Sequence, residues 1–270
     1  MTTQEFSIEF DILYNNLASN AAPPLNEYEK SVFLTKAQSD IVLELYSGRN
    51  NLGLSFESSE EVSEYLKPLI TSKVINLRYI SESRDYWNLK DLLRYELVDN
   101  SASSTVDYQS DIMIRLREEI LEEEDYSSST TYKTYPVIPV TLDTLDSILN
   151  NPFRGPKFGK RALRIDSKLP ESTGSSKNNI TILMSNETPS GSTLLFKYRV
   201  WYLRYPKPII IGIPKANQAE ANNVTIEGED ITDSSQCELP ASLHRMILDR
   251  AVLYAKQAYI GGQAQRAQQE

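Results

Sequence analysis

One histidine and one cysteine stand out among the 270 residues of this chain, because these side chains most often act as general bases and nucleophiles. Cys237 comes seven residues before His244, so a thiolate activated by an imidazole is conceivable. A lone buried cysteine is usually inert, and a histidine in the first turns of a helix is more simply a surface or interface residue. The glycine-flanked serine of a hydrolase elbow is missing. We therefore predict that the chain is not an enzyme, with a Cys237/His244 hydrolase as a less favoured alternative.

Metal and cofactor motifs are also missing. The sequence contains no CxxC, HExxH or EF-hand pattern, and neither GxxxxGK[ST] nor GxGxxG occurs. Ten glycines leave few loops that could cradle a phosphate group. We therefore predict no cofactor and no metal site. A carboxylate-metal nuclease built on an acidic run is a further enzyme alternative.

That acidic run follows three apolar residues with helical spacing. Ile112, Leu116 and Ile120 lie four residues apart, which predicts a short helix. The acidic residues at its C-terminal end are Glu118, Glu119, Glu122, Glu123, Glu124 and Asp125. Negative charge at that end opposes the helix dipole, so the run is either a solvated face or a surface that a basic neighbour neutralises.

A basic stretch is the natural complement. The sequence NPFRGPKFGKRALRID at 151–166 contains two prolines and two glycines, which exclude a regular helix or strand over most of its length. Aromatic residues and prolines hold such a loop still, and rigid charged loops tend to carry contacts. The contact residues that we expect here are Arg154, Lys157, Phe158, Lys160, Arg161 and Arg164. Their partner could be an acidic protein surface or DNA phosphate, and we predict that they meet residues 118–125 of a neighbouring subunit.

The overall composition narrows the class of protein. A net charge of −9 and a pI of about 4.9 argue against a protein that coats nucleic acid, and they make a DNA-binding regulator an unlikely third alternative. A single cysteine allows no disulfide within the chain. The N-terminus lacks signal-peptide features, and the apolar cluster at 209–213 is too short to span a bilayer. These features predict a soluble intracellular product without membrane contact.

Hydrophobic periodicity predicts helices at both ends of the chain. In the first half we expect helices at 5–18, 26–48 and 59–69, then a strand at 74–80. The segment 85–98 fits either a helix or a strand. Asn26 and Glu29 form a capping-box pattern, and Gly48 is suited to end the second helix.

The second half predicts a sheet followed by a helix. We expect strands at 137–140, 162–165, 180–184 and 194–205, with the last two joined as a hairpin, and a short helix near 141–150. Segments 209–213 and 224–226 could extend the sheet. A final helix should begin at Pro240 and end at Gly261–Gly262.

The predicted fold class is therefore α+β, with terminal helices around a mainly antiparallel sheet in the second half. We divide the chain into a mainly helical region at 1–98, a Ser/Glu-rich linker or insertion at 99–136 that holds the short acidic helix, and a sheet region at 137–270 with the basic loop and the closing helix.

Four blocks of the sequence, in the same order, resemble virion structural proteins of crAss-like and related tailed podovirus phages. The blocks are EFDILYNNLASNAAPPLNEYEKSVFLTKAQSDIVLELYSGRN near the N-terminus, LGLSFESSEEVSEYLKPLI at 52–70, the segment 137–166, and the segments YRVWYLRYPKPIII and CELPASLHRMILDRAVLYAKQAYIG within 198–261. They cover well over half of the chain. The stretch 99–135 does not match the pattern.

The resemblance implies a ring or connector protein of the neck, between portal and tail. It implies a virion location after assembly in the host cytoplasm, a cyclic homo-oligomer of twelve copies, contact with the portal and other ring proteins, and genomic DNA passing through without sequence-specific binding. A head-to-tail ring needs two different faces on each subunit, which separated acidic and basic elements supply. A tail adhesion or receptor-binding protein is the alternative, although strong helical ends do not suit the β-rich trimers of that class.

Overall fold

A computed structural model describes residues 1–17, 24–49, 53–79, 92–98, 111–126, 129–151, 153–157, 160–166, 180–185, 195–212, 225–231 and 233–267. The chain divides into two compact units. The helical unit comprises Met1–Ile70 and Tyr205–Glu270, and the barrel unit comprises Thr71–Arg204. Residues from both chain ends therefore build one unit. This grouping by contact differs from the three consecutive regions proposed from the sequence.

The elements and their bounds, in chain order, are α1 (Thr3–Leu17), α2 (Glu27–Ser47), α3 (Glu60–Leu66), η1 (Lys67–Leu69), β1 (Ile70–Tyr79), β2 (Leu92–Val98), β3 (Ile112–Tyr126), β4 (Ser129–Val140), α4 (Leu142–Leu149), β5 (Ala162–Asp166), β6 (Ile180–Ser185), β7 (Leu195–Arg204), β8 (Thr225–Ile226), β9 (Glu229–Asp230) and α5 (Ala241–Ala267). This order confirms the α+β class, with helices at both ends and a mainly antiparallel sheet. The strand expected at 74–80 is present as β1, and together with β2 it joins the same sheet as the strands of the second half.

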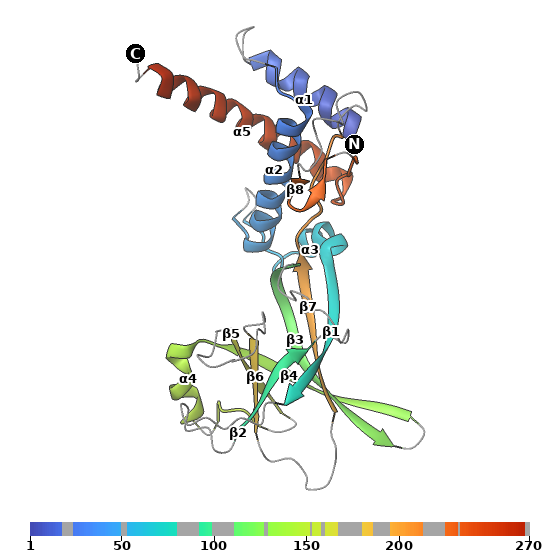
Figure 1. The fold of residues 1–270 in the computed structure, drawn as a ribbon, viewed down its shortest axis with the longest axis vertical. Helices are drawn as coiled ribbons and strands as arrows, with labels where there is room; N and C mark the ends of the chain where they lie inside the picture. The colour runs from blue at the N-terminus through green and yellow to red at the C-terminus, as the bar shows by residue number, and fades with distance from the viewer. Residues whose placement is uncertain are drawn as a thin grey trace. The chain divides into compact units, whose positions relative to one another are not determined.

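The helical unit packs α1 and α2 against α5 (Figure 1). Its buried apolar residues recur at helical spacing, for example Phe6 and Phe10 on α1 and Ile247 and Ala251 on α5. The predicted ends of α2 are confirmed: Asn26 and Glu29 form a capping box, and Gly48 ends the helix with a left-handed backbone at φ 74°. Local chemistry thus sets the ends of α2, while burial of one face holds it in place.

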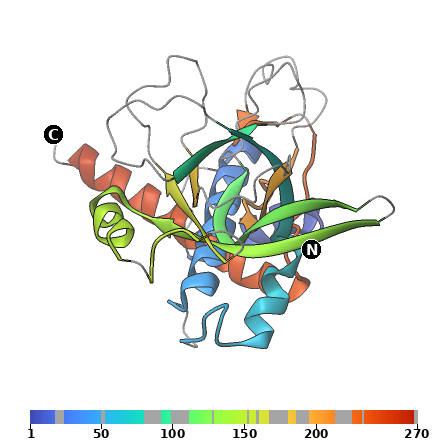
Figure 2. The same cartoon turned by 90° about the horizontal axis from the view of Figure 1, so that it is seen from below.

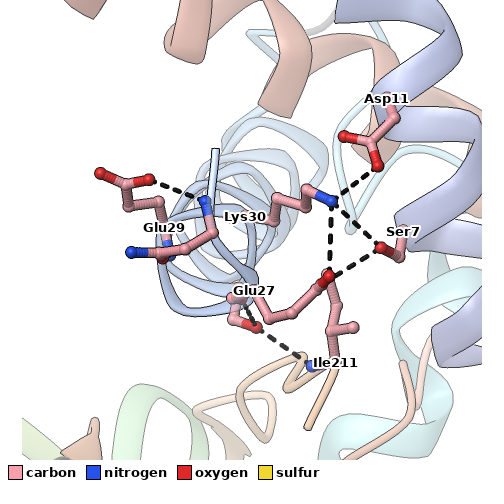
Figure 3. A network of polar contacts seen from close by, with 8 residues as sticks. Ser7, Asp11, Glu27, Glu29, Lys30 and Ile211 are labelled. Atoms are coloured by element: carbon pink, nitrogen blue, oxygen red, sulfur yellow. Dashed lines mark hydrogen bonds and ion pairs between the residues drawn. The ribbon is translucent and has the colours of Figure 1, made fainter. Parts of the chain in front are cut away.

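A polar network fastens α1 to α2 (Figure 3). Lys30 is only 3% exposed, and its ammonium group lies 2.7 Å from the Asp11 carboxylate and 3.2 Å from the Ser7 hydroxyl. The Ser7 hydroxyl in turn donates to Glu27 at 3.1 Å. Because a buried ammonium group needs paired acceptors, these contacts fix how α1 lies on α2.

Two predictions for the helical unit are wrong. The last helix does not end at Gly261–Gly262 but continues to Ala267. The segments 209–213 and 224–226 do not extend the main sheet: Ile210 bridges only to Ser235, and β8 pairs with β9 in a separate hairpin. Residues 213 and 224 lie outside the described residues. Short apolar runs carry no information about their pairing partner, which explains the second error.

The barrel unit is a closed barrel with strand order β1-β2-β6-β5-β4-β3-β7. Among the described residues, the strands pair antiparallel except for β4 with β5, whose parallel pairing follows from the crossover through α4. The predicted hairpin of β6 with β7 is wrong, because β6 pairs with β2 and β5 while β7 pairs with β3. Buried residues of one face fill the interior, among them Ile120, Val137, Ile182 and Tyr198.

The prediction of a short acidic helix is also wrong, because residues 112–126 form the long strand β3. The error has a simple cause. A spacing of four residues fits one face of a helix, but it is also a multiple of the two-residue period of a strand. Ile114 lies between Ile112 and Leu116, and this alternation with Met113 and Arg115 is the strand pattern. In the ambiguous segment 85–98, the described part forms strand β2.

Within the described residues, no helix combines the length and the apolar character needed to cross a bilayer.

Candidate functional site

The basic loop is held in one conformation by backbone contacts. The amides of Arg154 and Gly155 both donate to the carbonyl of Asn151 at 3.0 Å, just after α4. Farther on, Lys157 and Arg161 pair as an antiparallel bridge, with the Lys157 amide 3.0 Å from the Arg161 carbonyl. The Arg161 guanidinium donates to the carbonyl of Phe153 and so ties the two parts together.

This loop carries an exposed aromatic side chain and several exposed cations. Phe153 is 81% exposed, and Arg154, Lys157 and Lys160 are exposed beside it in the sequence. Phe158, which we also expected at the contact, lies outside the described residues. We name residues 153–157 and 160–161 the Phe153 loop. An aromatic side chain that is exposed to water is unfavourable in the free chain. Covering it with a partner surface would therefore contribute to binding.

Arg164 belongs to a different environment. It is 5% exposed on β5, two residues after Ala162 and therefore on the interior face of the barrel. Its Nε lies 2.7 Å from the Glu118 carboxylate, whose side chain is 7% exposed, and the Tyr198 hydroxyl donates to the same carboxylate at 2.7 Å. One member of the basic set and one of the acidic set therefore pair inside a single chain.

The ion pair continues toward solvent through Asp166. This carboxylate accepts from Arg164 and lies 3.2 Å from Nη1 of Arg115. Burial alone would lower the pKa of Arg164, but the hydrogen bond to Asp166 and the negative charge of Glu118 raise it above its ordinary value. Arg164 therefore remains charged inside the barrel, neutralised by carboxylates of its own chain.

Glu119 faces the opposite side of the same strand. Its carboxylate accepts from Arg199 at 2.6 Å and lies 3.3 Å from Arg117. Both guanidinium groups also lie over the ring of Trp201, at 5.3 Å for Arg117 and 4.5 Å for Arg199. The charges of these three side chains are balanced by salt bridges, and cation–π contacts hold the two arginines in place. Glu119 therefore stabilises the pairing of β3 with β7 within one chain.

The remaining acidic residues lie toward the far end of β3. Glu122 is buried and lies opposite Lys133 of β4. The pairing of β3 with β7 ends at Glu123 and Leu195, whereas the pairing with β4 continues to Tyr126 and Ser129. We name residues 124–126 and 129–131, with Glu123 at the base, the hairpin arm. Figure 2 shows the arm extending away from the barrel.

Cys237 and His244 do not form an activated pair. Burial raises the pKa of the Cys237 thiol to about 11, which keeps it protonated at neutral pH. His244 donates from Nε2 to the carbonyl of Leu239 at 2.9 Å and packs its ring 5.5 Å from that of Phe6. Burial lowers the pKa of His244 below its ordinary value, which favours the neutral imidazole. In the described residues, no cluster of three or more His, Cys, Asp or Glu side chains is arranged for a metal ion.

Comparison with known proteins places this architecture in a class of virion proteins. The family model described as phage tail ring protein 3/4 matches residues 1–268, so the chain belongs to that family. Among its relatives, the chain is 33% identical to "Ring protein 4/5" of Bacteroides phage crAss001, over 97% of this chain and 94% of the relative. It is 32% identical to "Ring protein 3" of the same phage, over 94% of this chain and 95% of the relative.

Sequence reasoning missed the charged pair inside the barrel. Arg164 and Glu118 each belong to an apolar alternation, ALRI on β5 and IMIRLREEI on β3, at a position where a strand points inward. A charged residue at an inward position is the signal that could have indicated the pair. Its partner could not be named, because Glu118 and Arg164 are 46 positions apart in the sequence and lie on strands that β4 separates in the barrel.

Proposed function

We propose that the chain is a structural subunit of a ring in the head-to-tail connector, or neck, of a tailed phage, and that it has no catalytic role. The observation that carries this proposal is membership, over almost the full chain, in a family of phage tail ring proteins. A copy number of twelve, matching the portal, is the expected stoichiometry. The ring is part of the virion and assembles in the host cytoplasm.

Neighbouring subunits contact each other through opposite charges. A cyclic assembly uses heterologous interfaces, so each chain needs two different complementary surfaces. The exposed part of the basic set is Arg154, Lys157 and Lys160, and the acidic residues that follow Glu122 on β3 are Glu123, Glu124 and Asp125. Arg164 and Glu118 contribute indirectly, by holding the barrel that carries both surfaces.

Contacts of the ring with the portal and with other ring proteins follow from its place in the neck. The two relatives from one phage carry different ring names, which supports several related rings in one tail. A net charge of −9 suits a channel wall that DNA passes without binding, because phosphates find few cations to neutralise them.

Native mass spectrometry tests the assembly, on the purified chain alone and mixed with the portal protein of the same phage. A closed high-order oligomer, or a monomer that joins the portal in stoichiometric copies, is the expected result. A monomer or trimer that ignores the portal would refute the connector role and favour adhesion.

Charge reversal tests the surfaces. Replacing Arg154, Lys157 and Lys160 with glutamate should block assembly. Reversing Glu123, Glu124 and Asp125 to lysine in the same chain should partly restore it. Arg164 and Glu118 stay unchanged, because their loss would destabilise the barrel itself. A double reversal that assembles no better than the single one contradicts the pairing.

A further inference from the structure

We propose that the Phe153 loop of one copy holds the hairpin arm of the adjacent copy, with Phe153 as the apolar centre of the contact and the surrounding cations facing the acidic end of the arm. This inference rests on the proposed ring function and names the segments that close the ring. The element that this inference adds is Phe153, an apolar residue that is part of neither the basic nor the acidic set.

The hairpin arm forms the acidic side of this contact. Within the residues that the structure describes, β3 and β4 pair with each other beyond Glu123. An isolated two-stranded hairpin is marginally stable in water, so contact with another surface would stabilise it. Glu123, Glu124 and Asp125 bring three acidic residues in succession to this end of β3. Repulsion among them is relieved by a cationic surface and increased by an acidic one.

The Phe153 loop has the features of such a surface. Interface hot spots combine an aromatic or arginine anchor with a polar surround that excludes water. Here the anchor is Phe153, and the exposed cations Arg154, Lys157 and Lys160 belong to the same loop. The hydrogen bonds of Asn151 and Arg161 to the loop backbone fix the conformation in advance, which lowers the entropy cost of binding.

The two surfaces cannot meet within one copy. The arm lies at the Ser129 end of β4, whereas the basic loop leads into Ala162, which pairs with Val137. Eight residue steps of about 3.3 Å separate Ser129 from Val137, so the two positions are about 26 Å apart. Figures 1 and 2 both show α4 and the arm on opposite sides of the barrel. Complementary surfaces that point apart on one rigid unit are satisfied by a second copy in head-to-tail contact.

Cysteine crosslinking tests this contact directly. In a Cys237→Ser background, Glu124→Cys and Arg154→Cys place one thiol on each surface, and a short bis-maleimide links those that meet. We expect a ladder of covalent oligomers on a denaturing gel. The matched control combines Arg154→Cys with Asp249→Cys, an exposed position on α5, and should give no ladder above background. A mixture of the two single-cysteine chains should stop at dimers.

Loss of the anchor provides the second measurement. Phe153→Ser should raise the protein concentration at which half of the ring dissociates by at least tenfold, without lowering the melting temperature of the chain. Leu142→Ser is the matched control, because Leu142 is an exposed apolar residue of the same unit, and it should change that concentration by less than threefold.

The outcomes separate this inference from the ring function. A closed ring that gives no crosslinks above the control, or that tolerates Phe153→Ser, overturns the arm contact and leaves the ring function intact. A chain that forms no high-order oligomer, alone or with the portal protein, overturns both.

Discussion

Replacing Arg164 with methionine should strongly lower the free energy of unfolding of the barrel unit. The substitution leaves the Glu118 carboxylate buried beside Tyr198 without its cation. Removing one partner of a buried ion pair costs about 3–5 kcal/mol in free energy of unfolding, against a total of about 5–15 kcal/mol for a typical domain. Asp166 adds little to this loss, because it is partly exposed and keeps Arg115.

The double substitution Arg164→Met with Glu118→Leu separates pairing from packing. Replacing a whole buried pair by apolar residues is often neutral or stabilising, and only the Tyr198 hydroxyl loses its acceptor, at about 1 kcal/mol. The double variant should therefore recover most of the stability lost in the single one. Lys157→Met is the matched control on the exposed loop and should change stability by less than about 0.5 kcal/mol.

Urea unfolding followed by tryptophan fluorescence measures these differences. Both tryptophans of the sequence, Trp87 and Trp201, fall within the stretch Thr71–Arg204 that makes up the barrel unit, so the fluorescence signal reports that stretch. A loss below about 1 kcal/mol for Arg164→Met would refute the buried pair. If the same variant then failed to form rings, Arg164 would instead act between subunits, as the charge pattern of the sequence first indicated.

Three smaller predictions concern the helical unit, and circular dichroism at 222 nm measures each. Asn26→Ala should cost about 1 kcal/mol, because it removes the acceptor of the Glu29 amide, while Asn26→Ser should cost little. Gly48→Ala should cost about 1 kcal/mol, since an alanine at φ 74° is strained; an unchanged midpoint would contradict the left-handed cap. Burial lowers the pKa of His244, so as the pH falls the unfolded state binds this proton before the folded state does. The contribution of His244 to the free energy of unfolding should therefore be complete above about pH 6.5 and decline as the pH falls toward the folded-state pKa. His244→Asn should flatten that decline, and an unchanged pH profile would contradict a buried neutral imidazole.

The sequence predicted best what is encoded locally. The ends of α2 follow from side chains within a few residues, Asn26 with Glu29 at one end and Gly48 at the other, so pattern and structure agree. The sequence predicted least well where one residue spacing fits both a helix and a strand, and where interacting residues lie far apart in the sequence. Spacing of four residues on β3 fitted a helix, and only burial on both faces of a barrel decided for a strand. The neighbours of β6 depend on closure of the whole sheet.

The candidate site shows the same division. The rigidity and charge of the Phe153 loop could be predicted from prolines, glycines and basic residues in one stretch. The different fates of Lys157 and Arg164 could not, since one is exposed and the other lies in the barrel, and both belong to the same basic stretch. Which residues of a charged run remain available to a neighbour is settled by strand register, a property of the assembled fold.

The discontinuous helical unit also fixes an order of events during synthesis. The barrel unit ends at Arg204, so all of its strands are synthesised before α5. The apolar faces of α1 and α2, synthesised first, are covered only when α5 arrives. We therefore expect the inserted barrel to fold first, while the apolar faces of α1 and α2 stay exposed until α5 is complete. Proteolysis of chains truncated after residue 210 would reveal this as a protected barrel attached to a digestible N-terminus, whereas protection of α1 and α2 would contradict it.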